Sequence, residues 1–340
     1  MKQIQIGEPF HVRVREDAQI PTPNGGEALL QVLYCGICGA DLASYTGNQP
    51  FTTYPRVPGH EFSARIVDIP ENDKGLKPGD VVTCNPYFNC GKCYSCRRGF
   101  VNCCTDNQTM GVQRDGAFQE YITMPVQRIF PGKGLSARQL ALVEPFCIGH
   151  HGISRGNVQK GDKVLIVGAG PIGMFAMLSA KAVGAKVYMT DLLDGRLEKA
   201  KEMGADGVAN GKNPEELKAL NQKVTNGDGF DVCVECCGAP ETFLTCIDQA
   251  AFAAKIILIG NGKRDTTFLH SILLKKELNV FGSRNAYNSD FEQVIDILAS
   301  GKVDVEPLVS AEYRLEQTGG YPLWVFDIVR RQKTWTTEMI

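Results

Sequence analysis

Short runs of alternating apolar and polar residues fill the first part of the chain, up to about residue 130. Four such runs lie at residues 28–33, 63–69, 81–83 and 118–123. Turn-forming segments such as Gly25-Gly26 and residues 77–80 separate them. Alternation with period two is typical of half-buried strands, and Gly, Pro and Asp mark turns. The pattern predicts a mostly β domain that forms a compact, partly closed barrel. No long amphipathic helix is expected in it.

The later part of the chain alternates between strand-like and helical patterns. Apolar runs that predict strands lie at residues 163–167, 186–190, 231–235, 255–260 and 279–281. Patterns that predict helices lie at residues 174–183, 196–203 and 289–300. Strands that alternate with helices are typical of parallel sheets. We therefore expect a doubly wound, six-stranded parallel sheet that binds its ligand at the carboxyl ends of the strands.

A glycine-rich turn joins the first of these strands to its helix. The segment reads KVLIVGAGPIG, so that Gly168, Gly170 and Gly173 follow the strand at once. In dinucleotide-binding sheets the first glycine makes the tight turn, the second lets backbone approach a pyrophosphate, and the third lets the helix pack closely. Free amide groups at the helix N-terminus would bind the phosphates. A parallel-sheet protein with such a turn and no cofactor is the alternative.

Asp191 ends the second strand, about twenty residues past the glycines, where an acid is expected to bind the ribose hydroxyls of NAD. The same carboxylate would repel the 2′-phosphate of NADP, so NAD is the expected cofactor. The residues expected to bind it are Gly168, Gly170, Pro171, Ile172, Gly173, Asp191, Arg196, Cys237, Ile259, Gly260 and Ser283. For the residues that follow the later strands, ordinary loop packing is the alternative.

Composition is that of an ordinary globular chain of two domains. The 340 residues are 43% hydrophobic and 22% charged, with a net charge of -2. This balance gives no reason to expect nucleic acid or an anionic membrane as a partner. The N-terminus lacks the apolar core of a signal peptide, and no apolar run reaches membrane length. We expect a cytoplasmic protein whose 13 cysteines stay reduced, so that clustered cysteines indicate metal.

The densest cysteine cluster lies in a turn-rich segment. Cys90, Cys93 and Cys96 are separated by two residues each, and Cys103 and Cys104 follow. Four thiolates satisfy tetrahedral zinc and leave no position for water or substrate. The cluster predicts a structural zinc with either Cys103 or Cys104 as the fourth ligand, against the alternative of scattered free cysteines.

Ligand types for a catalytic zinc occur earlier in the chain. The segments CGICGAD and PGHE supply Cys38, His60 and Glu61. A catalytic zinc takes thiolate, imidazole or carboxylate ligands and keeps one position open. Sequence spacing does not show that these residues meet, and a single Cys or His is often a core residue. Cys35 and Cys38 also form a Cys-x-x-Cys pair, for which a redox role is a second interpretation.

The segments CGICGAD, PGHE, the cysteine cluster, LVEP and GAGPIG occur in one order. Together they resemble the zinc-containing medium-chain dehydrogenase/reductase family over essentially the whole chain. The resemblance implies an α/β protein with a GroES-like catalytic domain at residues 1–150, a Rossmann domain at 151–284 and a C-terminal return at 285–340. It also implies an active site in the cleft between the domains and a homodimer or homotetramer. The structural zinc ligands that it selects are Cys90, Cys93, Cys96 and Cys104.

The resemblance also assigns roles at the catalytic zinc. Cys38, His60 and Glu144 match its ligands, and Glu61 matches an acid that can join or leave the metal. Asp41 matches a carboxylate that orients the ligating histidine. Taken without the resemblance, Glu144 is equally well the acidic residue of a helix's first turn.

Glutamate at position 144 is similar to the sorbitol and polyol dehydrogenase branch of the family. The segments GNQPF, YPRV and GSRN are similar to bacterial hexonate 5-dehydrogenases that act on L-galactonate, L-gulonate or L-idonate. The implied reaction transfers a hydride between NAD and a secondary alcohol of a sugar acid, at C5. Arg284 would bind the substrate carboxylate, and Tyr45 is a further candidate contact. A polyol such as sorbitol or xylitol, or L-threonine, is the alternative substrate.

Ala40 departs from the family pattern, in which Ser or Thr begins a proton relay from the alcohol. Ala43 likewise stands where alcohol dehydrogenases can carry a relay histidine. The candidates to replace the relay are zinc-bound water, Glu144, Glu61, Ser44 and Tyr45. The departure leaves open a relative that binds zinc and nucleotide without catalysis. The 13 cysteines leave open a thiol-redox or metal-buffering protein.

Overall fold

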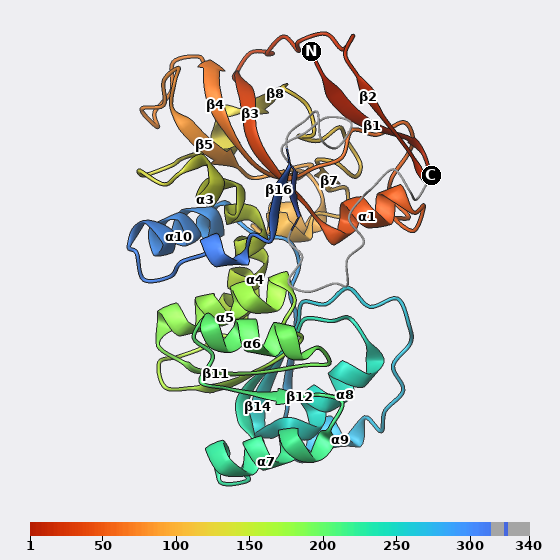
Figure 1. The fold of residues 1–340 in the computed structure, drawn as a ribbon, viewed down its shortest axis with the longest axis vertical. Coiled ribbons are helices and arrows are strands. Elements are labelled where there is room, and N and C mark those ends of the chain that lie inside the picture. The colour runs from red at the N-terminus through yellow and green to blue at the C-terminus, as the bar shows by residue number, and fades with distance from the viewer. Residues whose placement is uncertain (314–322, 326–340) are drawn as a thin grey trace. The chain divides into compact units, whose positions relative to one another are not determined.

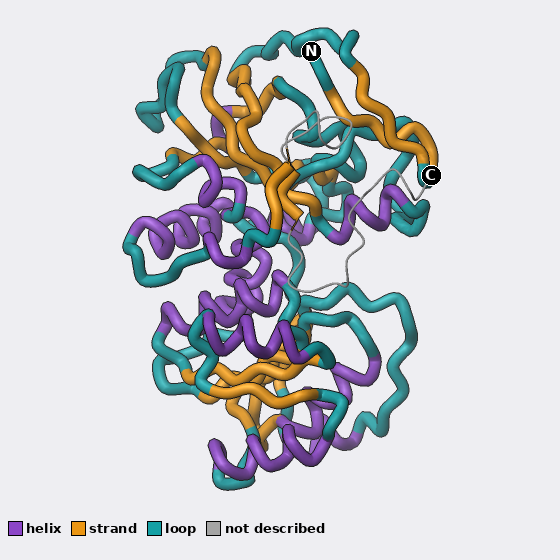
Figure 2. The backbone as a smooth tube through the Cα atoms, in the orientation of Figure 1, coloured by secondary structure: helices purple, strands orange, loops and turns teal. Residues whose placement is uncertain are grey.

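The computed structural model describes residues 1–313 and 323–325, and the chain divides into two compact units. The first unit is Met1–Glu144 together with Ala286–Ile340, and the second is Pro145–Asn285. Strands and loops make up much of the first unit, whereas helices and strands alternate in the second (Figure 2). The predicted C-terminal return includes residues 314–322 and 326–340, which lie outside the described part.

A seven-stranded sheet forms the centre of the first unit, and two small two-stranded sheets accompany it. Its strands lie in the order β16-β17-β3-β4-β5-β9, and β8 pairs with β3. Figure 1 labels β3, β4, β5, β8 and β16 of this sheet. The strands of this unit are β1 (Gln3–Glu8), β2 (His11–Arg15), β3 (Glu27–Ile37), β4 (Glu61–Asp68), β5 (Val81–Cys84), β6 (Tyr87–Phe88), β7 (Gln108–Thr109), β8 (Tyr121–Pro125), β9 (Ile129–Pro131), β16 (Ala311–Tyr313) and β17 (Leu323–Val325).

Helices of the first unit are short, apart from one near its C-terminal end. They are α1 (Gly39–Tyr45), α2 (Tyr94–Arg97), α3 (Ala137–Ala141) and α10 (Asn288–Ala299), with 3-10 turns η1 (Val101–Cys103), η2 (Val126–Arg128) and η3 (Glu306–Leu308). Helix α4 (Val143–Arg155) begins at the end of this unit and continues into the second. The helical pattern predicted at residues 289–300 corresponds to α10.

The core of the first unit follows from the alternation seen in the sequence. Ala28 and Leu30 on β3 are fully buried, and Phe62, Ala64 and Ile66 on β4 are buried beside them. Because β3 and β4 are antiparallel, with Leu30 opposite Ile66, their apolar faces lie together. The prediction of a mostly-β domain is therefore confirmed.

The strand predicted at residues 118–123 lies further along the chain, as β8 (Tyr121–Pro125). Ala117 and Phe118 pair elsewhere, because their amide groups donate to Gly59 O at 2.9 Å and Pro58 O at 3.0 Å. The apolar pattern therefore runs across two different pairings. Residues 117–118 bond the segment before β4, and β8 pairs with β3. Alternation alone does not show where such a change occurs.

A six-stranded parallel sheet forms the second unit, in the order β12-β11-β10-β13-β14-β15. Its strands are β10 (Lys163–Val167), β11 (Lys186–Asp191), β12 (Gly207–Asn210), β13 (Phe230–Glu235), β14 (Ala250–Leu258) and β15 (Asn279–Gly282). Its remaining helices are α5 (Pro171–Val183), α6 (Asp194–Glu202), α7 (Pro214–Thr225), α8 (Pro240–Gln249) and α9 (Ser271–Lys276). Helices α5 and α6 cover one face of the sheet, and α7 and α9 lie on the other (Figure 1).

This strand order is that of a Rossmann fold, as predicted. The chain starts in the middle at β10, moves outward to β12, and then crosses to β13 on the other side of β10. The loops after β10 and β13 therefore diverge at the point where the strand order reverses. Ligands of doubly wound sheets bind at this point.

The elements of the second unit follow from local sequence. Val164, Leu165 and Ile166 on β10 are fully buried, as expected for a central strand covered on both faces. Helix α5 begins at Pro171 and ends before Gly184, which has a left-handed φ of 95°. The sequence pattern did not indicate strand β12, because it has only four residues and lies at the sheet edge. Helix α7 was not predicted either.

Among the described residues, none of the helices has both the length and the apolar character needed to cross a membrane.

Packing between Phe130 and Phe291 gives a test of the first unit's core. Both rings are buried and stack at 5.2 Å between centroids, joining β9 to α10. We expect Phe291→Ala to lower the free energy of unfolding by about 3–5 kcal/mol, because it leaves a cavity in a packed core. Chemical denaturation would measure the change. Phe51→Ala, at a side chain that is 65% exposed, is the control. Equal stability of the two variants would contradict the assignment of Phe291 to the core.

Candidate active site

Cys38, His60 and Glu61 lie together in the first unit, although 22 positions separate the first from the second. Each offers one ligand atom, and these atoms all lie within 4.8 Å of one another. The pairing of β3 with β4 explains their proximity, because Gly36 near the end of β3 lies opposite Glu61 at the start of β4. The structure thus brings together three residue types that zinc binds.

Asp41 joins the two segments that carry these side chains. Its carboxylate is buried and accepts a hydrogen bond from Cys38 N at 2.9 Å and one from Gly59 N at 3.0 Å. Its Oδ1 lies 3.9 Å from His60 Nδ1, which is too long for a hydrogen bond. In this structure Asp41 therefore positions Cys38 and His60 through backbone amide groups.

Glu144 does not belong to the set of three ligand atoms. It lies in the first turn of α4, as its alternative interpretation predicted, and its side chain is 2% exposed. Its Oε1 accepts a hydrogen bond from the hydroxyl of Tyr87, a residue of β6. Sequence reasoning missed Tyr87, because no local motif marks a residue that is 57 positions from its partner.

The carboxylates around this site are buried and close enough to affect one another's pKa. Burial raises the pKa of Asp41 and of Glu144, and burial together with the nearby Glu144 charge raises the pKa of Glu61 well above its usual value. His60 Nδ1 and Glu61 Oε2 are buried and have no hydrogen-bond partner among the described residues. Buried polar atoms without partners are costly, and a cation would offset that cost.

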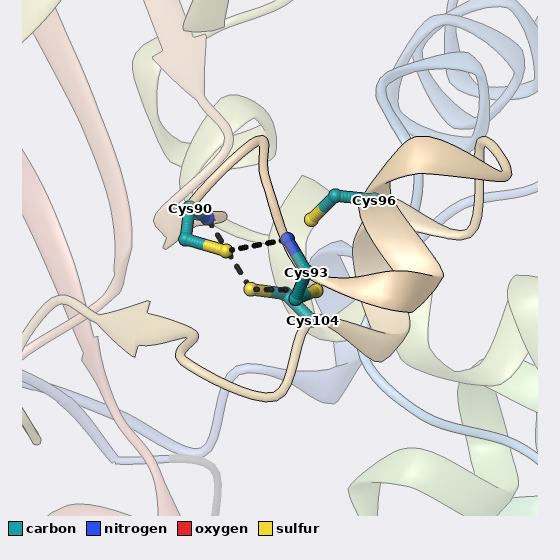
Figure 3. A group of neighbouring side chains, drawn as sticks. All are labelled: Cys90, Cys93, Cys96 and Cys104. Carbon is teal, nitrogen blue, oxygen red and sulfur yellow. Dashed lines mark hydrogen bonds between the residues drawn. The ribbon is translucent and has the colours of Figure 1, made fainter.

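The four cysteines of the turn-rich segment form a second cluster. The sulfur atoms of Cys90, Cys93, Cys96 and Cys104 all lie within 4.8 Å of one another and point toward a common centre (Figure 3). Backbone amide groups orient them: Cys90 N donates to Cys104 Sγ at 3.2 Å, and Cys93 N donates to Cys90 Sγ at 3.3 Å. Cys103 is not a member of the cluster.

Hydrogen bonds within this lobe favour the thiolate form. The amide groups of Cys96 and Thr105 lower the pKa of Cys93 to about 5, and amide groups also lower the pKa of Cys90. Burial raises the pKa of Cys104 to about 11. Thiolates are the form that binds metal, so the lobe has the chemistry of a zinc site with four sulfur ligands.

The redox interpretation of Cys35 and Cys38 finds no support. Cys35 is buried, its thiol donates to Gly36 O at 3.7 Å, and it does not join the cluster of Cys38. Burial raises the pKa of both thiols well above the usual value. Redox-active pairs require the opposite shift.

The glycine-rich turn of the second unit has the geometry that its sequence predicts. Gly168 has a φ of 105°, which favours glycine. A Cβ on Gly173 would lie 1.8 Å from Gly168 O, whereas a Cβ on Gly170 would have nothing within 4 Å. The third glycine is thus required by packing of the helix. The second leaves the N-terminus of α5 open.

Asp191 holds this turn in place. Its Oδ2 accepts a hydrogen bond from Ala169 N at 2.8 Å, and its Oδ1 accepts one from Leu193 N at 3.0 Å. Arg196 Nη1 lies 3.3 Å from Asp191 Oδ2. The carboxylate at the end of β11 is therefore fixed beside the glycine turn.

The loop after β13 lies against the same turn. A Cβ on Gly168 would lie 2.5 Å from Cys237 Sγ, so these two predicted residues are in close proximity. Glu235 fixes the loop, because its Oε1 accepts hydrogen bonds from Cys237 N at 2.7 Å and Gly238 N at 2.9 Å. Gly260 also approaches Gly238 closely. The two loops at the switch point are therefore packed together.

The other predicted residues occupy the following places. Pro171 and Ile172 are the first residues of α5, Ile259 packs against Gly152, and Ser283 N donates to Leu258 O at 2.9 Å. Arg284 is exposed and follows β15. Tyr45, at the end of α1, packs edge-on against Phe10 at 5.5 Å, and the hydroxyl of Ser44 bonds Thr52 at 2.7 Å.

Comparison with known proteins identifies the family. Residues 24–134 match the alcohol dehydrogenase GroES-like domain, and residues 171–300 match the zinc-binding dehydrogenase family. The chain is 34% identical to L-galactonate-5-dehydrogenase of Escherichia coli K12 over 300 residues, which covers 88% of each protein. The chain belongs to the zinc-type medium-chain dehydrogenase family.

Two further relatives of this dehydrogenase are informative. Sorbitol dehydrogenase of Halalkalibacterium halodurans is also 34% identical, over 90% of each chain. The crystal structure of the alcohol dehydrogenase RspB from Escherichia coli CFT073, in complex with NADH, is similar with a TM-score of 0.85. It is 33% identical, and the match covers 92% of each chain. The dehydrogenase is therefore an oxidoreductase of the zinc-dependent alcohol and polyol class.

The cysteine lobe of the dehydrogenase gives a direct test of metal binding. We expect Cys93→Ser to lower the bound zinc from about two ions per chain to about one, because three sulfurs do not complete a structural site. Elemental analysis of the purified protein would measure the stoichiometry. Cys103→Ser is the matched control, since Cys103 lies outside the cluster, and it should retain both ions. Loss of zinc in the control, or full zinc in Cys93→Ser, would contradict the ligand assignment.

Proposed function

We propose that this dehydrogenase oxidises a secondary alcohol of a sugar acid, at C5 of a hexonate such as L-gulonate or L-galactonate, with NAD as cofactor. The relationship to L-galactonate-5-dehydrogenase, together with the exposed Arg284 after β15, carries the proposal. Sorbitol dehydrogenase is equally similar, so oxidation of a polyol is the second candidate.

The donor sets of both clusters fit zinc. The lobe offers four sulfurs, and the other cluster offers a thiol, an imidazole and a carboxylate. The buried atoms His60 Nδ1 and Glu61 Oε2, without hydrogen-bond partners among the described residues, fit a site completed by a cation. Cys38, His60 and Glu61 would hold the catalytic zinc, and Cys90, Cys93, Cys96 and Cys104 the structural one. When bound, the catalytic zinc supplies Lewis-acid polarisation of the substrate oxygen.

The glycine turn fits a dinucleotide. The space beside Gly170 at the N-terminus of α5 is open, and Asp191 is bonded to the turn at Ala169. Both observations support a site in which Asp191 binds the ribose hydroxyls. The relative RspB binds NADH, which supports the same cofactor here. When bound, the nicotinamide accepts or donates the hydride. The residues of this chain orient the cofactor, and Asp191 opposes a 2′-phosphate.

A sugar acid differs from a polyol by its carboxylate, which needs a cationic partner. Arg284 is an exposed residue, and Arg binds carboxylates with two parallel hydrogen bonds. Tyr45 remains a candidate contact to the substrate hydroxyls.

Proton transfer cannot start from a hydroxyl at position 40, where this chain has Ala40. The hydroxyl of Ser44 is bonded to Thr52, and the ring of Tyr45 packs against Phe10. Glu144 is a carboxylate in the buried site and can hold a proton there, and Glu61 can do so when it is not bound to the zinc. We therefore favour a carboxylate over these two hydroxyls as the group that receives the alcohol proton.

We also propose a cytoplasmic homodimer or homotetramer. Edge strand β15 exposes Val280, and the neighbouring β14 exposes Phe252, which is 63% accessible. Apolar side chains at a sheet edge fit an interface between copies of the chain.

The two glycines of the turn give a test of cofactor binding. We expect Gly170→Ala to keep the stability of the protein and to weaken NADH binding at least about tenfold, because its methyl group occupies the space needed for pyrophosphate approach. Gly173→Ala should instead destabilise the fold, since its Cβ would meet Gly168 O at 1.8 Å. Fluorescence titration with NADH and thermal unfolding would measure the two effects. Unchanged NADH affinity in Gly170→Ala would contradict the proposed cofactor site.

A panel of hexonates, polyols and L-threonine tests the substrate class. The appearance of NADH measures the turnover of each compound. We expect turnover of one or two hexonates, with little turnover when NADP replaces NAD. Arg284→Ala should lower kcat/KM for the hexonate about tenfold or more, because hydrogen bonds to a charged group are lost. Arg264→Ala is the matched control, at an exposed arginine paired with Glu241.

The other outcomes of the panel separate the alternatives. Turnover of sorbitol or xylitol alone would replace the sugar-acid proposal by the polyol one. Preferred use of NADP would contradict the role given to Asp191. Binding of NADH without turnover of any panel member would contradict both substrate proposals and favour a catalytically idle relative.

A further inference from the structure

Tyr87 makes a hydrogen bond to Glu144 that the sequence motifs do not suggest. Its hydroxyl donates to Oε1 of Glu144, and both side chains are buried, with 7% and 2% exposed. A hydrogen bond to a carboxylate is strong when both groups are buried, because the local dielectric constant is low. Glu144 is therefore held in one orientation by a residue from a different element.

The backbone of Tyr87 is itself fixed from two sides. Arg128 donates from Nη1 to Tyr87 O, and Tyr87 N donates to Asn85 Oδ1 at 2.9 Å. Arg128 also donates to Asn89 Oδ1 at 2.8 Å and lies over the ring of Phe88. The backbone of the segment before the cysteine lobe is thus anchored by contacts that do not involve Glu144.

Four side chains that could bind a metal lie in or beside this site, one more than a catalytic zinc takes. Cys38, His60 and Glu61 form a compact set of ligand atoms, and Glu144 does not join it. A catalytic zinc takes three protein ligands and keeps one position for water or substrate. A fourth protein ligand in that position would compete with the substrate oxygen.

We propose that Tyr87 is a positioning residue that holds Glu144 out of the metal's ligand set, so that the fourth position stays open for the alcohol. The proposal rests on the proposed function, because it assigns the open position to the same substrate. Tyr87 acts on the metal site through its hydrogen bond to Glu144.

The test compares the parent protein with Tyr87→Phe after Co²⁺ has replaced zinc in both. The visible absorption of bound Co²⁺ reports its coordination geometry. In Tyr87→Phe, Glu144 loses its hydrogen bond and is free to join the metal. We expect the visible bands to weaken as coordination rises from four to five, a change that catalytic zinc sites also undergo. KM for the alcohol should rise about tenfold to a hundredfold, the range set by one hydrogen bond to a charged group, while NADH affinity is unchanged.

Two further variants show whether Tyr87 acts through Glu144. Glu144→Gln alone should leave the Co²⁺ spectrum unchanged, because Glu144 is not a ligand when Tyr87 is present. Adding Tyr87→Phe to Glu144→Gln should cause no further spectral change, since an amide is a poor ligand for the metal. Tyr188→Phe, at a buried tyrosine of the second unit, is the matched control and should resemble the parent protein.

Three results would overturn the proposal. They are an unchanged spectrum in Tyr87→Phe, a changed spectrum in Glu144→Gln, or the same change on adding Tyr87→Phe in both backgrounds. The cysteine lobe contributes equally to all spectra and cancels in the differences. Because the spectra need no substrate, failure of the substrate panel would refute the proposed function without deciding the role of Tyr87.

Discussion

The carboxylate of Asp41 is the constraint on which the active-site cluster depends. It accepts hydrogen bonds from the amide groups of Cys38 and Gly59. Cys38 directly follows β3, and Gly59 comes shortly before β4. A buried carboxylate with two amide donors has few alternative arrangements. Cys38 therefore has one position relative to His60 before any metal binds. The pairing of β3 with β4 brings the segments near each other, and Asp41 sets the distance between them.

The two metal-binding clusters differ in how well their membership could be predicted from the sequence. The cysteines of the lobe lie within a single short segment, and the turns between them suffice to direct the sulfurs inward. Their spacing therefore predicted a four-sulfur cluster, and the family resemblance chose Cys104 over Cys103. Similarly, the glycine turn and Asp191 are separated by one helix, so the βαβ pattern indicated their proximity. Local geometry is the part of a site that sequence reasoning predicts well.

Non-local contacts were harder to predict. Glu144 was expected among the zinc ligands from its motif position, and this role stays a prediction. The sequence did not indicate its hydrogen bond with Tyr87, which comes from a distant strand of two residues. The hydroxyls of Ser44 and Tyr45 were candidates for proton transfer, and their actual contacts depend on the loop after α1 and on the N-terminal hairpin. Period-two alternation predicted the strands of the first unit but not the change of pairing partner before β8. Short edge elements such as β12 have too few residues for a pattern.

Thiol chemistry is unevenly distributed over the chain. Buried Cys84, Cys233 and Cys246 have a raised pKa and are neutral at physiological pH, whereas the lobe carries thiolate at Cys93. Thiolates are the form that peroxides and alkylating reagents attack. A bound metal would occupy the lone pairs of the lobe's sulfurs. Oxidative damage to this protein would therefore begin at a demetallated lobe, and the cysteines inside the two cores would survive until the chain unfolds.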